Sequence, residues 1–258
     1  MRRLSDVAWL LPVQVINTRS QRLLSDGPGE RRAFMNWGVF HVEHEFAGEW
    51  RRYERALHQR NAALRHGDAR LASAWEPEMA AAAARVDEQR RRFLEGLWPY
   101  WQRLMTQWLP GLAMSWAYRR GWNEDVGLAE QLAGNRDREL TLGYSLRGPQ
   151  RGDLRLLASG REAGGELSRG QQKLVVTALR FGLVGLLREQ SSGVTPLVLI
   201  DDLPSELDSV NQRRVVESAA GTGAQTVVTA IERRGIDLGC VKPDALFHVE
   251  QGQVRDLL

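Results

Sequence analysis

Residues 167–208 of this 258-residue chain read LSRGQQKLVVTALRFGLVGLLREQSSGVTPLVLIDDLPSELD. The run from Leu197 to Ile200 is apolar and ends in two carboxylates, Asp201 and Asp202. Such a run predicts a buried parallel strand that delivers both acidic side chains to its carboxyl edge, where open α/β sheets place their ligands. Two adjacent aspartates at this edge suggest a Mg²⁺ ion and a water molecule beside a phosphate group.

The polar turn that opens this stretch predicts an anion-binding helix terminus. Ser168 can cap the helix that follows, and Gly170 lets an anion approach the N–H groups of the first turn. In order and spacing, the pieces resemble the signature (168–171), Walker B (197–202) and D-loop (205–208) segments of ABC-class ATPases. The alternative is an ordinary helix cap and an ordinary strand end, and the shared order of the pieces argues against it.

The composition is that of a globular protein whose positive charge is almost entirely arginine. The formal net charge is +3, and the only lysines are Lys173 and Lys242. Arginine suits bidentate contacts with phosphate, so a nucleic-acid partner fits this charge, although an arginine-rich solvated surface explains it equally well. The single cysteine, Cys240, excludes an internal disulfide and indicates the cytoplasm. No apolar run is long enough to cross a membrane, and no signal-peptide core follows Met1.

The order of elements predicts an α/β head interrupted by helices. Strands or extended segments are expected at Val7–Ile16, Ala113–Tyr118, Leu140–Leu146, Leu154–Leu157 and Thr226–Ile231. Helices are expected after Gly27, from Trp50 to Arg65, from Pro77 to Trp98, from Tyr100 to Leu109 and from Glu124 to Asn135. We expect the second and third helices to pair as an antiparallel hairpin. The helix-spaced tryptophans are expected in the core rather than in base stacking.

Together with the resemblance to ABC-class ATPases, this α/β pattern implies an incomplete ABC-ATPase-type head, namely its carboxyl-terminal lobe, interrupted by an inserted α-helical arm. Residues 1–29 are assigned to a remnant of the amino-terminal ATPase lobe, 30–135 to the arm, and 136–258 to the lobe with the signature, Walker B and D-loop segments. The first arm helix is amphipathic, and its arginines are expected to be solvated: Arg51, Arg52, Arg55, Arg60 and Arg65.

Further motifs across nearly the whole chain resemble the RecF family of bacterial recombination mediators. These motifs are GPGERRAF (27–34), WGVFH (37–41), QRNAAL (59–64), GP (148–149), LSRGQ (167–171) and the Asp201-Asp202 strand with SELD (205–208). The resemblance implies a weak ATPase that dimerises with ATP, binds gapped DNA or single-strand/double-strand junctions, and works with RecO and RecR to load recombinase.

The resemblance also implies roles for individual residues. Ser168, Arg169, Gly170 and Gln171 would face the ATP bound by the other subunit. Asp201 would hold Mg²⁺ through water, and Asp202 would orient the attacking water. Ser205 and Asp208 would form the D-loop that couples the two sites, and Thr229 would occupy the switch position. The DNA-binding candidates are Arg31, Arg32, Arg51, Arg52 and Arg55.

The main departure from the family is that no Gly-x-x-x-x-Gly-Lys-Ser/Thr motif, the Walker A or P-loop, occurs in the sequence. The chain looks like the carboxyl-terminal two thirds of the family, whether through its gene start, its preparation or a natural truncation. Without this motif, we expect weak ATP binding and no ATP turnover by this chain alone. We expect slow turnover even in an intact protein, because Asp202 stands where most ABC ATPases carry Glu.

Two other functions are compatible with the sequence. One is a non-catalytic module that pairs with a full-length head or with RecR. The other is the head of an unrelated ABC-type ATPase, such as a transporter subunit. The arm motifs between Gly27 and Leu64 favour the RecF assignment over the unrelated head.

Overall fold

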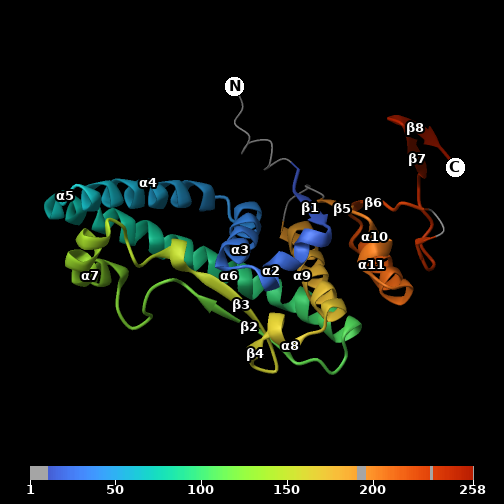
Figure 1. Cartoon of the computed structure of the whole chain (residues 1–258), viewed down its shortest axis with the longest axis horizontal. Helices are drawn as coiled ribbons and strands as arrows, with labels where there is room; N and C mark the ends of the chain where they lie inside the picture. Colours follow the sequence, from blue (N-terminus) through green and yellow to red (C-terminus); the bar gives the residue numbers. More distant parts are fainter. Residues whose placement is uncertain (1–10, 191–195, 233–234, 258) are drawn as a thin grey trace.

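The computed structural model describes residues 11–190, 196–232 and 235–257. The described strands are β1 (Val13–Ile16), β2 (Met114–Arg119), β3 (Asp153–Ala158), β4 (Arg161–Glu162), β5 (Leu197–Ile200), β6 (Gln225–Val228), β7 (Phe247–Glu250) and β8 (Gln253–Asp256). The α-helices are α2 (Arg22–Ser25), α3 (Pro28–Val42), α4 (Phe46–Arg65), α5 (Ala69–Ala74), α6 (Glu76–Trp108), α7 (Leu128–Leu142), α8 (Ala163–Glu166), α9 (Arg169–Gln190), α10 (Leu203–Glu206) and α11 (Ser209–Thr222). Two 3₁₀ turns, η1 (Thr18–Gln21) and η2 (Pro149–Arg151), complete the elements (Figure 1).

The parallel sheet has the strand order β1-β5-β6 and confirms the predicted strand in front of the two aspartates. Val198 and Ile200 of β5 are buried on the face that packs with α9 and α11. On the other face, Val15 and Val227 pair with opposite sides of Leu199 and remain 40% and 44% exposed. Parallel sheets are normally buried on both faces. In the described part of the chain, this sheet is therefore covered on one face only.

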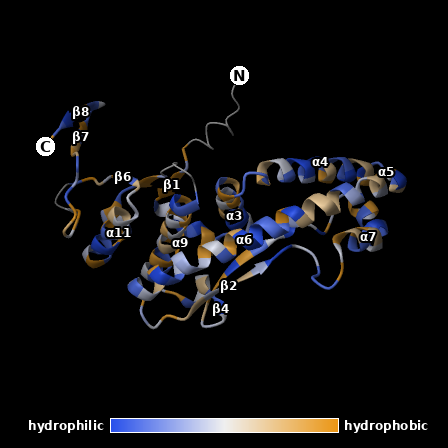
Figure 2. Ribbon diagram, turned by 180° about the vertical axis from the view of Figure 1, so that it is seen from behind, coloured by the Kyte–Doolittle hydropathy of each residue, from blue (hydrophilic) through white to orange (hydrophobic). Residues whose placement is uncertain are grey.

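The predicted helical hairpin is present, with α4 and α6 lying side by side (Figure 1). Along both helices, hydrophilic and hydrophobic residues alternate in stripes (Figure 2), as expected where one face of a helix is buried. The buried stripe joins Tyr53 and Ala56 of α4 to Met79 and Ala82 of α6. Alanine on the facing helix allows this close approach because its side chain is small.

Helix α6 is one continuous element of 33 residues, whereas the sequence suggested a kink or a new start at Pro99. The buried side chains Leu97 and Trp101 flank the proline and keep the helix on the core. Trp101 stacks on Trp116, with ring centroids 5.0 Å apart, and Trp108 is 1% exposed. The prediction that the helix-spaced tryptophans belong to the core is confirmed for these residues.

The strand predicted at Leu140–Leu146 is wrong. Helix α7 continues to Leu142 and ends at Gly143, whose φ of 75° gives the left-handed C-cap that glycine favours. Leu140 and Leu142 thus belong to the last turn of a helix, and the rest of the segment follows the helix end without forming a strand. By contrast, the strand predicted at Ala113–Tyr118 is confirmed as β2, which pairs antiparallel with β3.

The amino-terminal strand is partly confirmed. Val13–Ile16 forms β1 at the edge of the sheet, and the preceding residues Val7–Leu10 of the predicted segment lie outside the described part. None of the described helices is both long and apolar enough to cross a lipid bilayer.

The hydrophobic core has one large cluster and smaller ones. The large cluster unites α3, α6, β3, α9, β5 and α11, so it contains both Phe34 and Leu154. A separate cluster around Tyr53, Met79 and Leu132 lies toward the far end of α4 and α6. The division into lobe remnant, arm and lobe remains a prediction, and α6 contributes buried residues to both clusters.

Candidate active site

The carboxyl edge of the parallel sheet brings together the ends of three strands. Strand β5 places Asp201 and Asp202 there because Val198 and Ile200 hold it in the core, at 0% and 1% exposure. The Asp201 N–H donates to the Ile16 carbonyl oxygen at the end of β1, at 2.9 Å. The acid pair, as we call Asp201 and Asp202, therefore lies at the edge that the sequence predicted.

Thr229 joins both members of the acid pair. Its hydroxyl oxygen accepts a hydrogen bond from the Asp202 N–H at 2.9 Å and donates one to Asp201 Oδ1 at 2.9 Å. Asp202 has φ 48° and ψ 54°, a left-handed conformation that is uncommon for a residue other than glycine. The predicted switch residue thus follows β6 directly and holds the acid pair in a defined arrangement.

The signature turn, residues 168–171, confirms the predicted helix cap. The Gln171 N–H donates to Ser168 Oγ at 3.3 Å, and the Ser168 N–H donates to Gln171 Oε1 at 2.9 Å. This reciprocal pair is the capping box of helix α9. A Cβ atom at Gly170 would meet no other atom within 4 Å. Internal packing therefore does not require glycine here, and the exposed turn leaves room for an approaching group.

The D-loop residues have structural contacts of their own. Ser205 donates to the Asp202 carbonyl oxygen through its hydroxyl at 2.9 Å and through its N–H at 3.0 Å. Asp208 caps helix α11 by accepting from the Asn211 N–H at 3.0 Å. Hydrogen bonds from Asn211 hold the pKa of Asp208 below its usual value. Asp208 is thus a charged cap of the helix that follows the D-loop.

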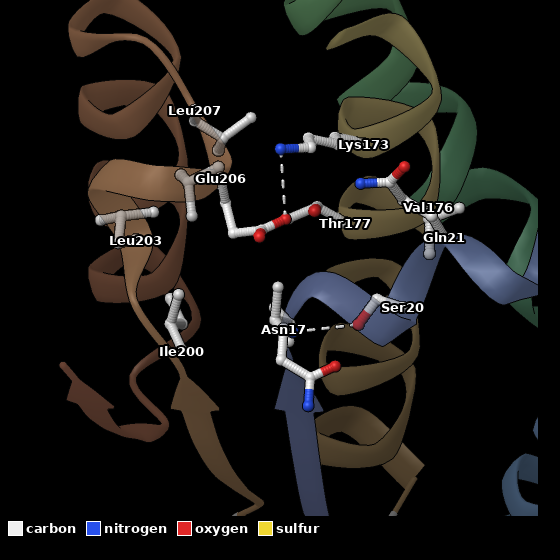
Figure 3. A pocket seen from close by; sticks show the side chains of 12 residues that line it. Asn17, Ser20, Gln21, Lys173, Val176, Thr177, Ile200, Leu203, Glu206 and Leu207 are labelled. Atoms are coloured by element: carbon white, nitrogen blue, oxygen red, sulfur yellow. Dashed lines mark hydrogen bonds and ion pairs between the residues drawn. The ribbon is translucent and has the colours of Figure 1, made fainter. Parts of the chain in front are cut away.

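Lys173 connects the signature helix to the D-loop, a contact that the sequence did not suggest. Its Nζ lies 3.5 Å from Glu206 Oε2, and the two side chains are 23% and 9% exposed. The side chains meet across a small cavity between α9 and α10 (Figure 3). This cavity holds about 10 Å³, which is room for about one water molecule rather than for a nucleotide.

The acid pair could serve a magnesium ion only together with water or other ligands. Within the described ranges, no group of three or more His, Cys, Asp or Glu residues is placed to hold a metal ion. Asp201 is exposed and offers carboxylate oxygens, the donor type that Mg²⁺ prefers, and Mg²⁺ commonly keeps several waters. The residues present therefore fit a water-mediated magnesium site.

Two of the predicted DNA-binding arginines make internal contacts. Arg31 pairs with Asp153, with Nε 2.7 Å from Oδ1 and Nη2 3.1 Å from Oδ2, and its side chain is 14% exposed. Arg32 donates to the Gly152 carbonyl oxygen at 3.0 Å, and burial lowers its pKa. These contacts anchor α3 to the start of β3, which favours a structural role for both side chains.

The three candidates on α4 lie on its exposed side. Arg51 and Arg55 are exposed, and Arg52 is 47% exposed beside Glu49 and Glu78. These three arginines of α4 are thus exposed to solvent, whereas Arg31 and Arg32 make contacts within the protein.

Arg60 corrects the expectation that the α4 arginines are solvated. Its side chain is 0% exposed and donates to Glu139 Oε2 at 2.6 Å, to Ser145 Oγ at 2.7 Å and to Glu76 Oε1 at 3.0 Å. The neighbouring Asn61 accepts the Ser145 N–H at 2.8 Å. The QRNAAL motif thus fixes the end of α7 against α4 and α6, with partners too distant in sequence to be predicted.

No protein-family model matches the chain. Curated relatives do match it, under the description DNA replication and repair protein RecF. A relative from Pseudomonas fluorescens is 42% identical over 257 residues, which is 98% of this chain and 70% of the relative. One from Chromohalobacter salexigens is 41% identical over 256 residues, covering 98% of this chain and 71% of the relative.

Solved structures of similar fold carry the same family name. The structure described as the recombination mediator protein RecF-ATPrS in the RecFOR pathway has a TM-score of 0.83 and 19% identity, covering 100% of this chain and 71% of that one. A second, described as RecF-ATP, has a TM-score of 0.80 and 20% identity, covering 96% of this chain and 69% of that one. At this identity the likeness concerns the fold.

Proposed function

This chain belongs to the RecF family of DNA replication and repair proteins, and from this premise we propose that it acts in ATP-gated binding of DNA during repair. The proposed substrate is gapped DNA or a single-strand/double-strand junction, where the protein helps to load recombinase together with RecO and RecR in the cytoplasm. The observation that carries the proposal is the hydrogen-bonded arrangement of Thr229 with both aspartates at the edge of the sheet.

The acid pair would supply the two carboxylates of the proposed phosphate chemistry. Asp201 would hold Mg²⁺ through water, and the carboxylate of Asp202 would accept a proton from, or orient, the attacking water. Bound Mg²⁺ would neutralise charge on the phosphates of ATP. The left-handed conformation of Asp202 supports a functional role, because such backbone outliers occur preferentially at active sites.

The signature turn would act on ATP held by a second subunit. Ser168, Arg169 and Gly170 are exposed at the N-terminus of α9, a position suited to an anion. We therefore place this face in a homodimer in which ATP contacts both heads and stabilises the closed form. The Lys173–Glu206 ion pair would keep the signature helix and the D-loop in a fixed relation within each subunit.

The test is ATP binding and hydrolysis by the purified chain, with and without gapped DNA. Since the sequence carries no P-loop motif, we expect no turnover by this polypeptide alone. Saturable hydrolysis that disappears in Asp201→Asn would show that a phosphate cradle exists within these residues. Binding of gapped DNA without any ATP effect would favour the second candidate, a non-catalytic interaction module, which the one-sided parallel sheet also supports.

For DNA, we propose that α4 supplies the contacts through Arg51 and Arg55, with Arg52 beside them. The contacts would be to phosphates, so affinity should be independent of sequence and should fall steeply with salt. Charge reversal of Arg51 and Arg55 to Glu should weaken binding at least tenfold at low salt. Reversal of Arg161, which is 76% exposed on β4, is the control. Equal affinity of the two variants would refute the assignment of α4.

A further inference from the structure

A second cavity, of about 250 Å³, lies beside the outer edge of β1. Its walls come from β1, η1, α2, α3 and one side chain of α9, Arg180. Leu23, Phe34 and Trp37 supply an apolar wall. Arg180 is seven residues after Lys173, or about 10 Å farther along α9, so this cavity is distinct from the small one beside Lys173 and Glu206, although Ser20 lines both.

Arg180 has few partners for a charged group in this position. Nη1 donates to Gln14 Oε1 at 3.3 Å, a long hydrogen bond. Nε is buried and has no hydrogen-bond partner. Among the described residues, no ion pair is found for this guanidinium within 4.0 Å. Burial lowers the pKa of Arg180, and the nearby charge of Glu30 only partly opposes this effect. A buried polar group without partners is costly, and an oxygen anion in the cavity would supply the missing acceptors.

The adjoining edge of β1 offers main-chain groups. The Leu197 N–H donates to the Pro12 carbonyl oxygen and the Asp201 N–H donates to that of Ile16, both at 2.9 Å. In a parallel pair, the hydrogen-bonding groups of successive residues point alternately to the two sides. The main-chain groups of Val13 and Val15 therefore point away from β5, on the side of β1 where no strand of the described residues pairs.

From these features we propose that the cavity binds an extended segment of a partner protein that carries one carboxylate side chain. The segment adds a strand to β1 through Val13 and Val15 and places one carboxylate against Arg180. Its side chain two residues farther on packs against Phe34 and Trp37, because residues i and i+2 of a strand share a face. Arg19, Glu30 and Arg180 line the cavity and together carry one net positive charge, so a single carboxylate neutralises the site, whereas a polyphosphate would leave it negatively charged.

The experiment uses a fluorescein-labelled peptide, Thr-Lys-Val-Thr-Asp-Thr-Val-Lys, and its Asn counterpart as the matched ligand. Fluorescence anisotropy with the whole chain should show binding of the Asp peptide at least tenfold tighter than that of the Asn peptide. Arg180→Met should abolish this preference and weaken binding of the Asp peptide by about tenfold or more, the range expected of a charge-assisted hydrogen bond. Arg161→Met, which removes an exposed arginine on β4, should change nothing.

Val15→Pro tests the strand addition separately. Proline removes only the N–H that points away from β5, so β1 should stay paired while the added strand loses a donor. We expect at least a threefold loss of affinity with an unchanged melting temperature. Amide hydrogen exchange at Val13 and Val15 should slow when the peptide binds.

Three results would overturn the proposal: no binding of the Asp peptide up to 1 mM, equal affinity for the Asp and Asn peptides, or full affinity in Val15→Pro. Complete competition by inorganic phosphate at equal concentration would also overturn it, since the cavity would then be a general anion site. If Arg180→Met fails to fold, the Asn peptide and Val15→Pro still decide the outcome.

Discussion

Replacing Arg60 by methionine should be among the most destabilising single changes in the arm. The substitution keeps a long apolar side chain but removes the guanidinium that binds Glu139, Ser145 and Glu76. Glu76 retains Arg136, whose Nε and Nη2 donate to it at 2.9 and 2.5 Å. Glu139, at 0% exposure, loses its ion pair and, among the described residues, keeps only the hydrogen bond from the Leu146 N–H at 2.6 Å. The expected cost is therefore that of an uncompensated buried carboxylate, about 3–5 kcal/mol.

The assay is thermal and urea unfolding followed by circular dichroism. For a chain of this size, about 1 kcal/mol shifts the melting temperature by about 2–4 °C, so Arg60→Met should lower it by about 6–20 °C. The control is Arg85→Met on α6, which removes an arginine that is 67% exposed and 3.2 Å from Glu88, and which should cost less than about 1 kcal/mol.

A second variant distinguishes the buried charge from lost packing. Adding Glu139→Gln to Arg60→Met removes the unpaired carboxylate, so part of the stability should return. A loss below about 1 kcal/mol in Arg60→Met, or no recovery in the double variant, would refute the reasoning from the buried charge.

Three further outcomes are expected, each from one described contact. Thr229→Val should cost about 0.5–1.5 kcal/mol, the net contribution of one hydrogen bond, because water can reach the exposed Asp202 N–H that loses its acceptor, while Thr229→Ser should keep most of the stability, as measured by urea unfolding. Burial lowers the pKa of His41 from its ordinary 6.5 to about 4, so the folded state binds fewer protons than the unfolded state between these pH values. The free energy of unfolding should therefore fall as the pH drops from about 6.5 toward 4, and His41→Gln should flatten this dependence. Gly38→Ala should destabilise the protein by about 1–3 kcal/mol because the new Cβ would overlap the Phe93 ring. Gly48→Ala, with open space around it, should be neutral or stabilise by up to about 1 kcal/mol. If Gly48→Ala lowered the melting temperature as much as Gly38→Ala, this comparison would be contradicted.

The parts of the site that follow local rules could be predicted from the sequence. The Leu197–Ile200 strand and the cap at Ser168 depend on neighbours within a few residues, and the structure contains both. The position of Thr229 followed from the same logic, since parallel strands end at a common edge.

The parts of the site that depend on residues far apart in the sequence could not be predicted. Arg60 and Arg51 look alike in the amphipathic pattern, yet only Arg60 meets carboxylates from other helices, including Glu139. Arg31 likewise finds Asp153, which is 122 residues away in the sequence. At Leu140–Leu142, an apolar run was too short to distinguish a strand from the last turn of a helix.

Helix α6 gives the molecule a mechanical property. It has buried residues in both main clusters and runs without interruption from Glu76 to Trp108. Its length is about 50 Å, so a tilt of about 5° at the Trp108 end displaces the Glu76 end by about 4 Å. A small rotation of α6 where it packs against the signature helix α9 would therefore produce a larger displacement at the Glu76 end of α6, where Arg60 binds Glu139 of α7.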